Sequence, residues 1–168
     1  MSLSMYDASV TVFQHNLRQL SHLLDKGLAH AAARHIDPAT LVNARLADDM
    51  RPLSFQIQSA SDASKLAVVR LTGVAAPSFP DTETTFAELK TRIDKTREYL
   101  QGVPREAFVG SEERKFSMKA GGAEIDFVGQ PYLLHFALPN FFFHVTTAYA
   151  ILRHHGVEIG KRDYLGRI

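Results

Sequence analysis

Two polar residues, Asn140 and His144, stand four positions apart in one of the most apolar stretches of the chain, which begins at Pro139. An imidazole can act as a general base, because its ordinary pKa lies near ~6.5, and it can also bind a metal. A carboxamide both donates and accepts hydrogen bonds. Buried polar groups need partners, so this pair marks a candidate site.

Helical geometry predicts that both side chains face the protein interior. At about 100° per residue, Asn140 lies about 40° from His144 around a helix. The same side carries the apolar residues Leu133, Ala148 and Ile151. The pair is therefore expected to sit in a packed core, where it can build a small site or fix how two helices align.

Partners for this pair are expected from an earlier helix, where three polar residues lie close together: Gln56, Gln58 and Asp62. Gln58 and Asp62 share one helix face, because four residues separate them. Tyr149, which follows His144 in the same apolar segment, joins the candidate ligand contacts.

Three interpretations of the pair stay open. Asn140 and His144 could hydrogen-bond to each other and to a neighbouring helix, which would fix the packing register. They could instead line a ligand site inside a helical bundle. As a metal site the set is poor, because zinc, nickel and iron prefer imidazole and carboxylate over neutral amides.

Apolar periodicity predicts the helices that hold these residues. Residues 4–34 and 83–101 each carry one apolar stripe, and residues 52–72 carry two, which is typical of a central helix. His15 and His22 point away from the first stripe and are expected to be solvated.

A β-hairpin and a last helix complete the predicted fold. Phe116 and Met118, and then Ile125 and Phe127, alternate with polar residues on either side of a glycine pair. The last helix should run from Pro131 to residue 155, with a kink or a late start caused by Pro139. We predict an all-α protein: a single domain over residues 1–168, built as an antiparallel four-helix bundle with a small β-hairpin between helices 3 and 4.

Composition excludes several classes of function. A net charge of +1 gives no nucleic-acid footprint, and no apolar run reaches the ~18 residues of a membrane span. There is no cysteine, which excludes disulfides and cysteine nucleophiles and fits a reducing compartment. Residues 1–7 lack the features of a secretory signal, so we expect a cytoplasmic protein.

The order of the helices and the C-terminal residues resemble a known family. Residues 139–144, the segment from Ala148 to Arg153, Gly156, and residues 159–165 are similar to an uncharacterised branch of the DinB/YfiT-like superfamily, a domain of unknown function (DUF number nineteen-ninety-three). The resemblance covers nearly the whole chain and implies a four-helix bundle and a homodimer.

The resemblance also implies a divalent metal, zinc or nickel, held by three histidines in many members of the superfamily. One ligand would lie on the second helix and two on the last helix, the second of them nine residues before an arginine. Arg153 is nine residues after His144, so His144 matches one ligand and Asn140 stands where the other should be. Gln56 or Gln58 stands in place of the third ligand.

We therefore expect a DinB-like protein with a degenerate metal site, acting as a small-molecule binding or regulatory module. The alternative is a divalent-metal-dependent enzyme or thiol-dependent transferase that uses His144 with an altered ligand set. Such a set would recruit His155 or Asp62.

Overall fold

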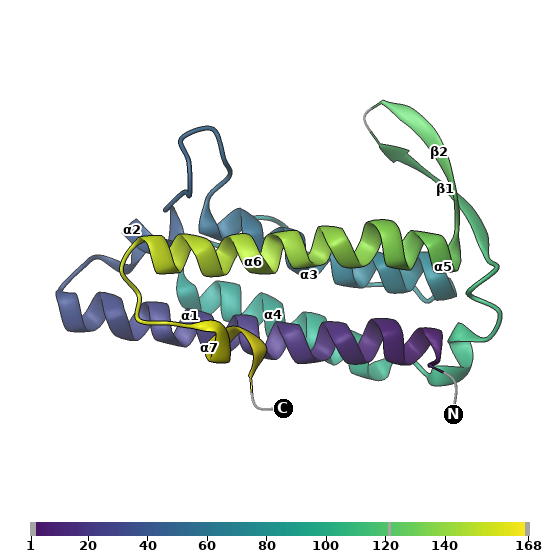
Figure 1. Ribbon diagram of the computed structural model, residues 1–168, viewed down its shortest axis with the longest axis horizontal. Coiled ribbons are helices and arrows are strands. Elements are labelled where there is room, and N and C mark those ends of the chain that lie inside the picture. The colour runs from purple at the N-terminus through teal and green to yellow at the C-terminus, as the bar shows by residue number, and fades with distance from the viewer. Residues whose placement is uncertain (1–2, 121, 167–168) are drawn as a thin grey trace.

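Four long helices dominate the structure, a computed structural model that describes residues 3–120 and 122–166 (Figure 1). The long helices are α1 (Val12–Arg34), α3 (Leu53–Thr72), α4 (Phe86–Gly102) and α6 (Leu138–His154). The shorter elements are η1 (Asp7–Thr11), α2 (Pro38–Val42), η2 (Arg105–Phe108), β1 (Lys115–Ala120), β2 (Ala123–Val128), α5 (Gly129–Tyr132), η3 (Leu133–Ala137) and α7 (Lys161–Leu165). The chain is thus mainly helical with one two-stranded antiparallel hairpin, and the predicted positions of the long helices are close to those observed.

The last helix reaches α6 through a wider π-helical turn. The helical path starts in α5, continues as the π-helical segment η3 and becomes α-helical at Leu138, one residue before Pro139. Proline has no N–H to donate, and its ring crowds the carbonyl four residues earlier. A π turn directly before Pro139 accommodates the ring, so the helix continues through a residue at which we expected a kink or a start.

The long helices do not alternate in direction as predicted. Gln58, near the start of α3, donates to Glu83, just before α4, and Tyr99, near the end of α4, donates to Val74, just after α3. α3 and α4 therefore run in the same direction, whereas α1 and α6 run the opposite way (Figure 1). Residues 73–85, the crossover segment, return along α3 from its end to Gln58 before α4 begins.

The predicted apolar stripes form the core between these helices. α3 packs on both α6 and α4, and α1 packs on α4 and α6. Phe13 of α1 meets Phe141 of α6 edge to face, with 4.9 Å between ring centroids. Other fully buried core residues include Leu17, Leu20, Leu24, Leu53, Ile57, Leu89, Ile93 and Ile151.

A buried arginine fastens the crossover segment to α3 and α4. The guanidinium of Arg92, on α4, is 2.9 Å from carboxylate oxygens of Glu83 and Asp81 in the crossover and of Asp62 on α3. Burial opposes its charge, but the bond with Glu83 and the charges of the carboxylates outweigh this, so the pKa of Arg92 is raised.

Lys65 extends this ion network along α3. Lys65 is only 3% exposed. Its ammonium donates to the Pro77 carbonyl at 3.1 Å and pairs with Asp62 at 3.0 Å. It also lies 3.8 Å from the ring centroid of Phe79. Lys65 therefore holds the crossover at Pro77, and Arg92 holds it at Asp81 and Glu83.

The predicted hairpin is present and stands out from the helices (Figure 1). Phe116 pairs across the strands with Phe127, and Met118 pairs with Ile125, so the alternating apolar residues share one face. Phe116 and Phe127 pack against Tyr132, which anchors the base of the hairpin to α5.

His15 and His22 also contact the C-terminal helix. His22 is exposed, as predicted, and His15 is partly covered. The His15 Nε2 atom lies 2.7 Å from the Leu165 carbonyl, and the His22 Nε2 atom lies 3.2 Å from a carboxylate oxygen of Asp163. α7 is therefore fixed across α1. Apolar periodicity did not predict α7, because a five-residue helix is too short to show a repeat.

None of the helices in residues 3–120 and 122–166 has the length and apolar character needed to cross a membrane.

Replacing Arg92 with methionine should destabilise the protein by about 2 to 4 kcal/mol, because it leaves the largely buried Glu83 and the exposed Asp81 without their cation, whereas Asp62 keeps Lys65. Urea unfolding measures the change. Arg97→Met, on the same helix, is the matched control and should cost only about 1 kcal/mol, because Arg97 makes a longer ion pair of 3.8 Å with the exposed Asp94 and its other side-chain bond is to the neutral Gln14. Equal losses in the two variants would contradict this role for Arg92.

Candidate functional site

The site is built on one hydrogen bond that joins α3 to α6. The Nδ1 atom of His144 lies 2.8 Å from the Oε1 atom of Gln56. Gln56 is 2% exposed and His144 is half-buried, so the bond forms at the edge of the core. Of the partners proposed from the sequence, Gln56 is the one that meets His144.

The orientation of the Gln56 amide determines the tautomer of His144. The amide nitrogen of Gln56 donates to the Arg51 carbonyl at 3.0 Å, and a carbonyl can only accept. The amide oxygen therefore faces His144 and must accept from a protonated Nδ1. In the neutral ring the Nε2 atom then carries the lone pair. Nε2 makes no hydrogen bond to the described residues and is not among their fully buried unpartnered atoms, so it reaches solvent.

Aromatic rings flank this imidazole. Phe55 and Phe143 meet it edge to face, with centroid distances of 6.2 Å and 5.3 Å. Phe143 is 57% exposed, which is high for a large apolar side chain. The guanidinium of Arg51 lies 4.6 Å from the Phe55 ring centroid. The site is thus an imidazole acceptor between two aromatic rings, with one cation beside it.

Burial lowers the pKa of His144 below its ordinary value of 6.5. The imidazole is therefore mainly neutral near pH 7, which keeps the Nε2 lone pair free to accept a proton or a hydrogen bond. The same lone pair is the feature that a general base or a ligand-binding acceptor needs.

The prediction that Asn140 faces the interior is wrong. Asn140 is exposed, whereas the buried residues of α6 include Phe141, Val145, Ala148 and Ile151. The centre of this buried face lies about 60° around the helix from His144, on the side away from Asn140. His144 therefore sits at the border of the face and Asn140 lies outside it, so these two residues do not form a buried pair.

Gln58 and Asp62 belong to the Arg92 ion network instead of the His144 site. Gln58 donates to Glu83 at 3.0 Å, and Asp62 pairs with Arg92 and Lys65. Gln58 points about 200° away from Gln56, because the two residues are two positions apart on the helix. The polar run on α3 therefore serves two different sites.

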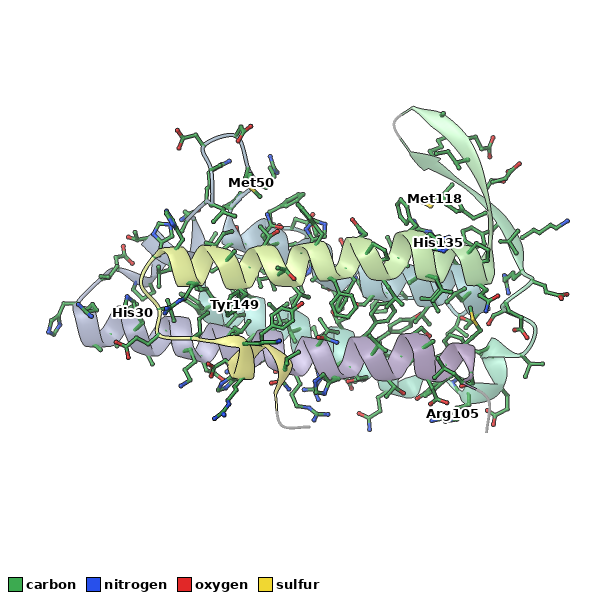
Figure 2. The ribbon with its side chains drawn as sticks, in the orientation of Figure 1. His30, Met50, Arg105, Met118, His135 and Tyr149 are labelled. Carbon is green, nitrogen blue, oxygen red and sulfur yellow. The ribbon has the colours of Figure 1, made fainter. Side chains whose placement is uncertain are left out.

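Tyr149 is also placed away from His144. It lies between α6 and α7 (Figure 2), with its ring edge to face against Tyr164 at 5.8 Å. His155, offered as a replacement metal ligand, is exposed at the end of α6, where it meets His154. Neither side chain joins the His144 site.

Sequence reasoning missed Phe55, Phe143 and Arg51 as members of the site. Phe55 and Phe143 directly precede Gln56 and His144, so sequence proximity was a signal for both. Apolar residues next to a candidate are usually assigned to the core, and this assignment hid them. Arg51 acts through its backbone carbonyl, a role that carries no side-chain signal.

The residues present do not fit the three-histidine metal that the superfamily implies. His144 is the one imidazole at the site, Asn140 is exposed, and the Gln56 oxygen already accepts from His144. In the part of the chain that the structure describes, no three His, Cys, Asp or Glu residues come together as metal ligands. We assign no metal chemistry to this set of donors.

Comparison with known proteins identifies the class to which this architecture belongs. The chain is similar to the crystal structure of a DinB family member protein from Shewanella denitrificans, with 40% sequence identity and a TM-score of 0.89. The match covers 98% of this chain and 93% of that one. This similarity in sequence and structure over almost the whole chain makes the protein a DinB-like helical protein. The chain belongs to the DUF1993 family, a domain of unknown function whose model matches residues 5–165. None of the curated proteins matches this chain.

The lowered pKa of His144 predicts a specific pH dependence of stability. Its folded-state pKa lies below the unfolded value near ~6.5, so the unfolded chain takes up this proton first as the pH falls. The stability that His144 contributes is complete above ~6.5 and is lost as the pH falls through the folded-state pKa. His144→Gln should therefore show a smaller loss of unfolding free energy between pH 7.5 and pH 5 in urea titrations.

The matched control is His135→Gln, which removes an exposed histidine in the helical segment leading to α6. Its pH dependence should follow that of the parent protein. A parent-like slope in His144→Gln would show that His144 does not titrate as its burial requires.

Proposed function

We propose that this protein binds a small organic molecule at His144, as a binding or regulatory module of the DinB-like class. The observation that carries the proposal is the Gln56–His144 hydrogen bond, because it fixes the Nδ1–H tautomer and leaves the Nε2 lone pair toward solvent. The absence of a fitting metal donor set among the described residues favours binding over metal-dependent catalysis.

The surroundings of Nε2 indicate the chemistry of the ligand. Nε2 would accept from a hydroxyl or an N–H group, and the rings of Phe55 and Phe143 would contact an aromatic or other flat apolar body. Burial keeps the imidazole neutral, so a donor is preferred over an anion at this atom.

A structural role for the same pair is the second candidate, and the same bond supports it. The Gln56–His144 contact joins α3 to α6 across a sequence separation of 88 residues. A buried hydrogen bond of this kind can fix the register of two packed helices without binding anything.

We also propose the finer architecture and assembly that the resemblance implies. The four long helices would form a single-domain DinB-like four-helix bundle, which the TM-score of 0.89 supports. The expected homodimer follows from the family resemblance, and light scattering of the purified protein would measure it.

Phenol and anisole separate the two candidate functions, because they share a ring and differ in the hydroxyl donor. A ligand site predicts that phenol shifts the His144, Phe55 and Phe143 signals in NMR titrations. Phenol should bind about 5-fold to 10-fold more tightly than anisole, the worth of one hydrogen bond. His144→Phe should abolish this preference while the protein stays folded.

His135→Phe serves as the control and should keep the parent's preference for phenol. Equal affinities for phenol and anisole, or no shifts at all, would leave the structural role as the sole function of the pair. In that case Gln56→Leu combined with His144→Phe should fold normally, because apolar groups replace both partners of the bond.

A further inference from the structure

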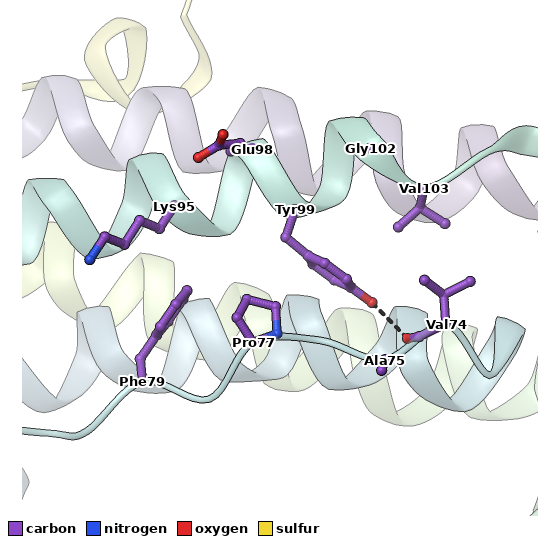
Figure 3. A pocket seen from close by; sticks show the side chains of 9 residues that line it. All are labelled: Val74, Ala75, Pro77, Phe79, Lys95, Glu98, Tyr99, Gly102 and Val103. Carbon is purple, nitrogen blue, oxygen red and sulfur yellow. Dashed lines mark hydrogen bonds between the residues drawn. The ribbon is translucent and has the colours of Figure 1, made fainter.

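A cleft far from His144 in the sequence lies between the crossover segment and α4 (Figure 3). Val74, Ala75, Pro77 and Phe79 form one wall. The other wall comes from one face of α4 and the residue after it, with the lining residues Lys95, Glu98, Tyr99, Gly102 and Val103. The volume of about 490 Å³ lies within the usual size range of small-molecule sites.

The walls of this cleft are held in place by polar contacts behind them. The Tyr99 hydroxyl donates to the Val74 carbonyl at 3.0 Å and so links the two walls toward the Val103 end of the cleft (Figure 3). Burial raises the pKa of Tyr99 to about 12, so the hydroxyl keeps its proton at physiological pH. Lys65 holds the other end through the Pro77 carbonyl and the ring of Phe79. The cleft is therefore largely pre-formed.

Gly102 leaves the cleft open without a packing reason. A Cβ atom added to Gly102 would meet no atom within 4 Å. Its backbone does not adopt the positive φ that favours glycine at helix ends. Gly102 is exposed and lines the cleft, so a side chain there would fit and would narrow the space beside Tyr99 and Val103.

Lys95 supplies a cation beside Phe79 at the rim of the cleft. Of the carboxylates nearby, Asp62, Asp81 and Glu83 are paired with Arg92 or Lys65, and Glu88 accepts from the backbone N–H groups of Thr84 and Thr85. Lys95 forms no ion pair with the described residues and extends toward Phe79 (Figure 3). Lys95 and Phe79 also line an adjoining pocket of about 320 Å³, so the cation stands between two hollows. Glu98 lies one helical turn away, at the other part of the rim.

We propose that this cleft is a second binding site, which takes a small amphipathic organic acid. The apolar body of the ligand lies across Pro77, Tyr99 and Val103, and its carboxylate pairs with Lys95. The ligand differs from the hydrogen-bond donor proposed at His144, and the two sites share no residue.

The test uses 4-phenylbutyrate, its neutral amide and 4-phenylbutylamine, with binding to the full-length protein followed by NMR. The acid should bind about twofold to fivefold more tightly than the amide or the amine, because only the acid pairs with Lys95. Lys95→Met should remove this preference. Gly102→Leu should abolish binding of all three compounds while the unfolding temperature stays unchanged or rises, because the new side chain occupies open space.

Three control variants establish whether the acid binds in the cleft. Lys119→Met removes an exposed cation on the hairpin, and Gly160→Leu adds a side chain at another glycine with open space around it; both should bind the acid as the parent does. His144→Phe should also leave acid binding unchanged, which keeps this test independent of the proposed function. Equal or tighter binding of the amine, unchanged binding in Gly102→Leu, or no binding of the acid at millimolar concentration would overturn the proposal.

Discussion

The buried guanidinium of Arg92 is the constraint on which the rest of the arrangement depends. Taking this charge out of water is unfavourable unless carboxylates surround it, and they come from α3 and from the crossover segment. The crossover must therefore lie along α3 and α4, which requires those two helices to run in the same direction. The same network engages Gln58 and Asp62, so Gln56 is the residue of that polar run that reaches His144.

Much of the fold could be predicted from the sequence because apolar periodicity and turn residues are local signals. The stripes of α1, α3 and α4 and the alternation of Phe116 and Met118 lead directly to the observed elements. Helix direction could not be predicted in this way. It depends on where residues 73–85 lie, and the ion pairs of Arg92 with Asp81 and Glu83 that place them leave no periodic signal in the sequence.

The candidate site could be predicted only in part, because a helical wheel gives relative angles and not the position of the buried face. His144 and Gln56 were both named from the sequence, and they meet. Asn140 failed because the core of α6 is centred on the side toward Val145, which leaves Asn140 in solvent. The family resemblance did not correct the error about Asn140, because it matches Asn140 to a metal-ligand position by sequence alone and takes no account of its exposure.

The shared direction of α3 and α4 also affects how the chain folds. Two antiparallel helices joined by a short loop can dock as a local unit, but α3 and α4 cannot, because the chain must first return along their length. Ser61 and Thr96, which bond between these helices, are 35 residues apart. The chain loses conformational entropy when it closes a loop of this length, and it does so before the contact stabilises the fold. Folding is therefore expected to be slower than in a simple up-and-down bundle. The crossover that shapes the second cleft thus delays the step in which the helices first come together.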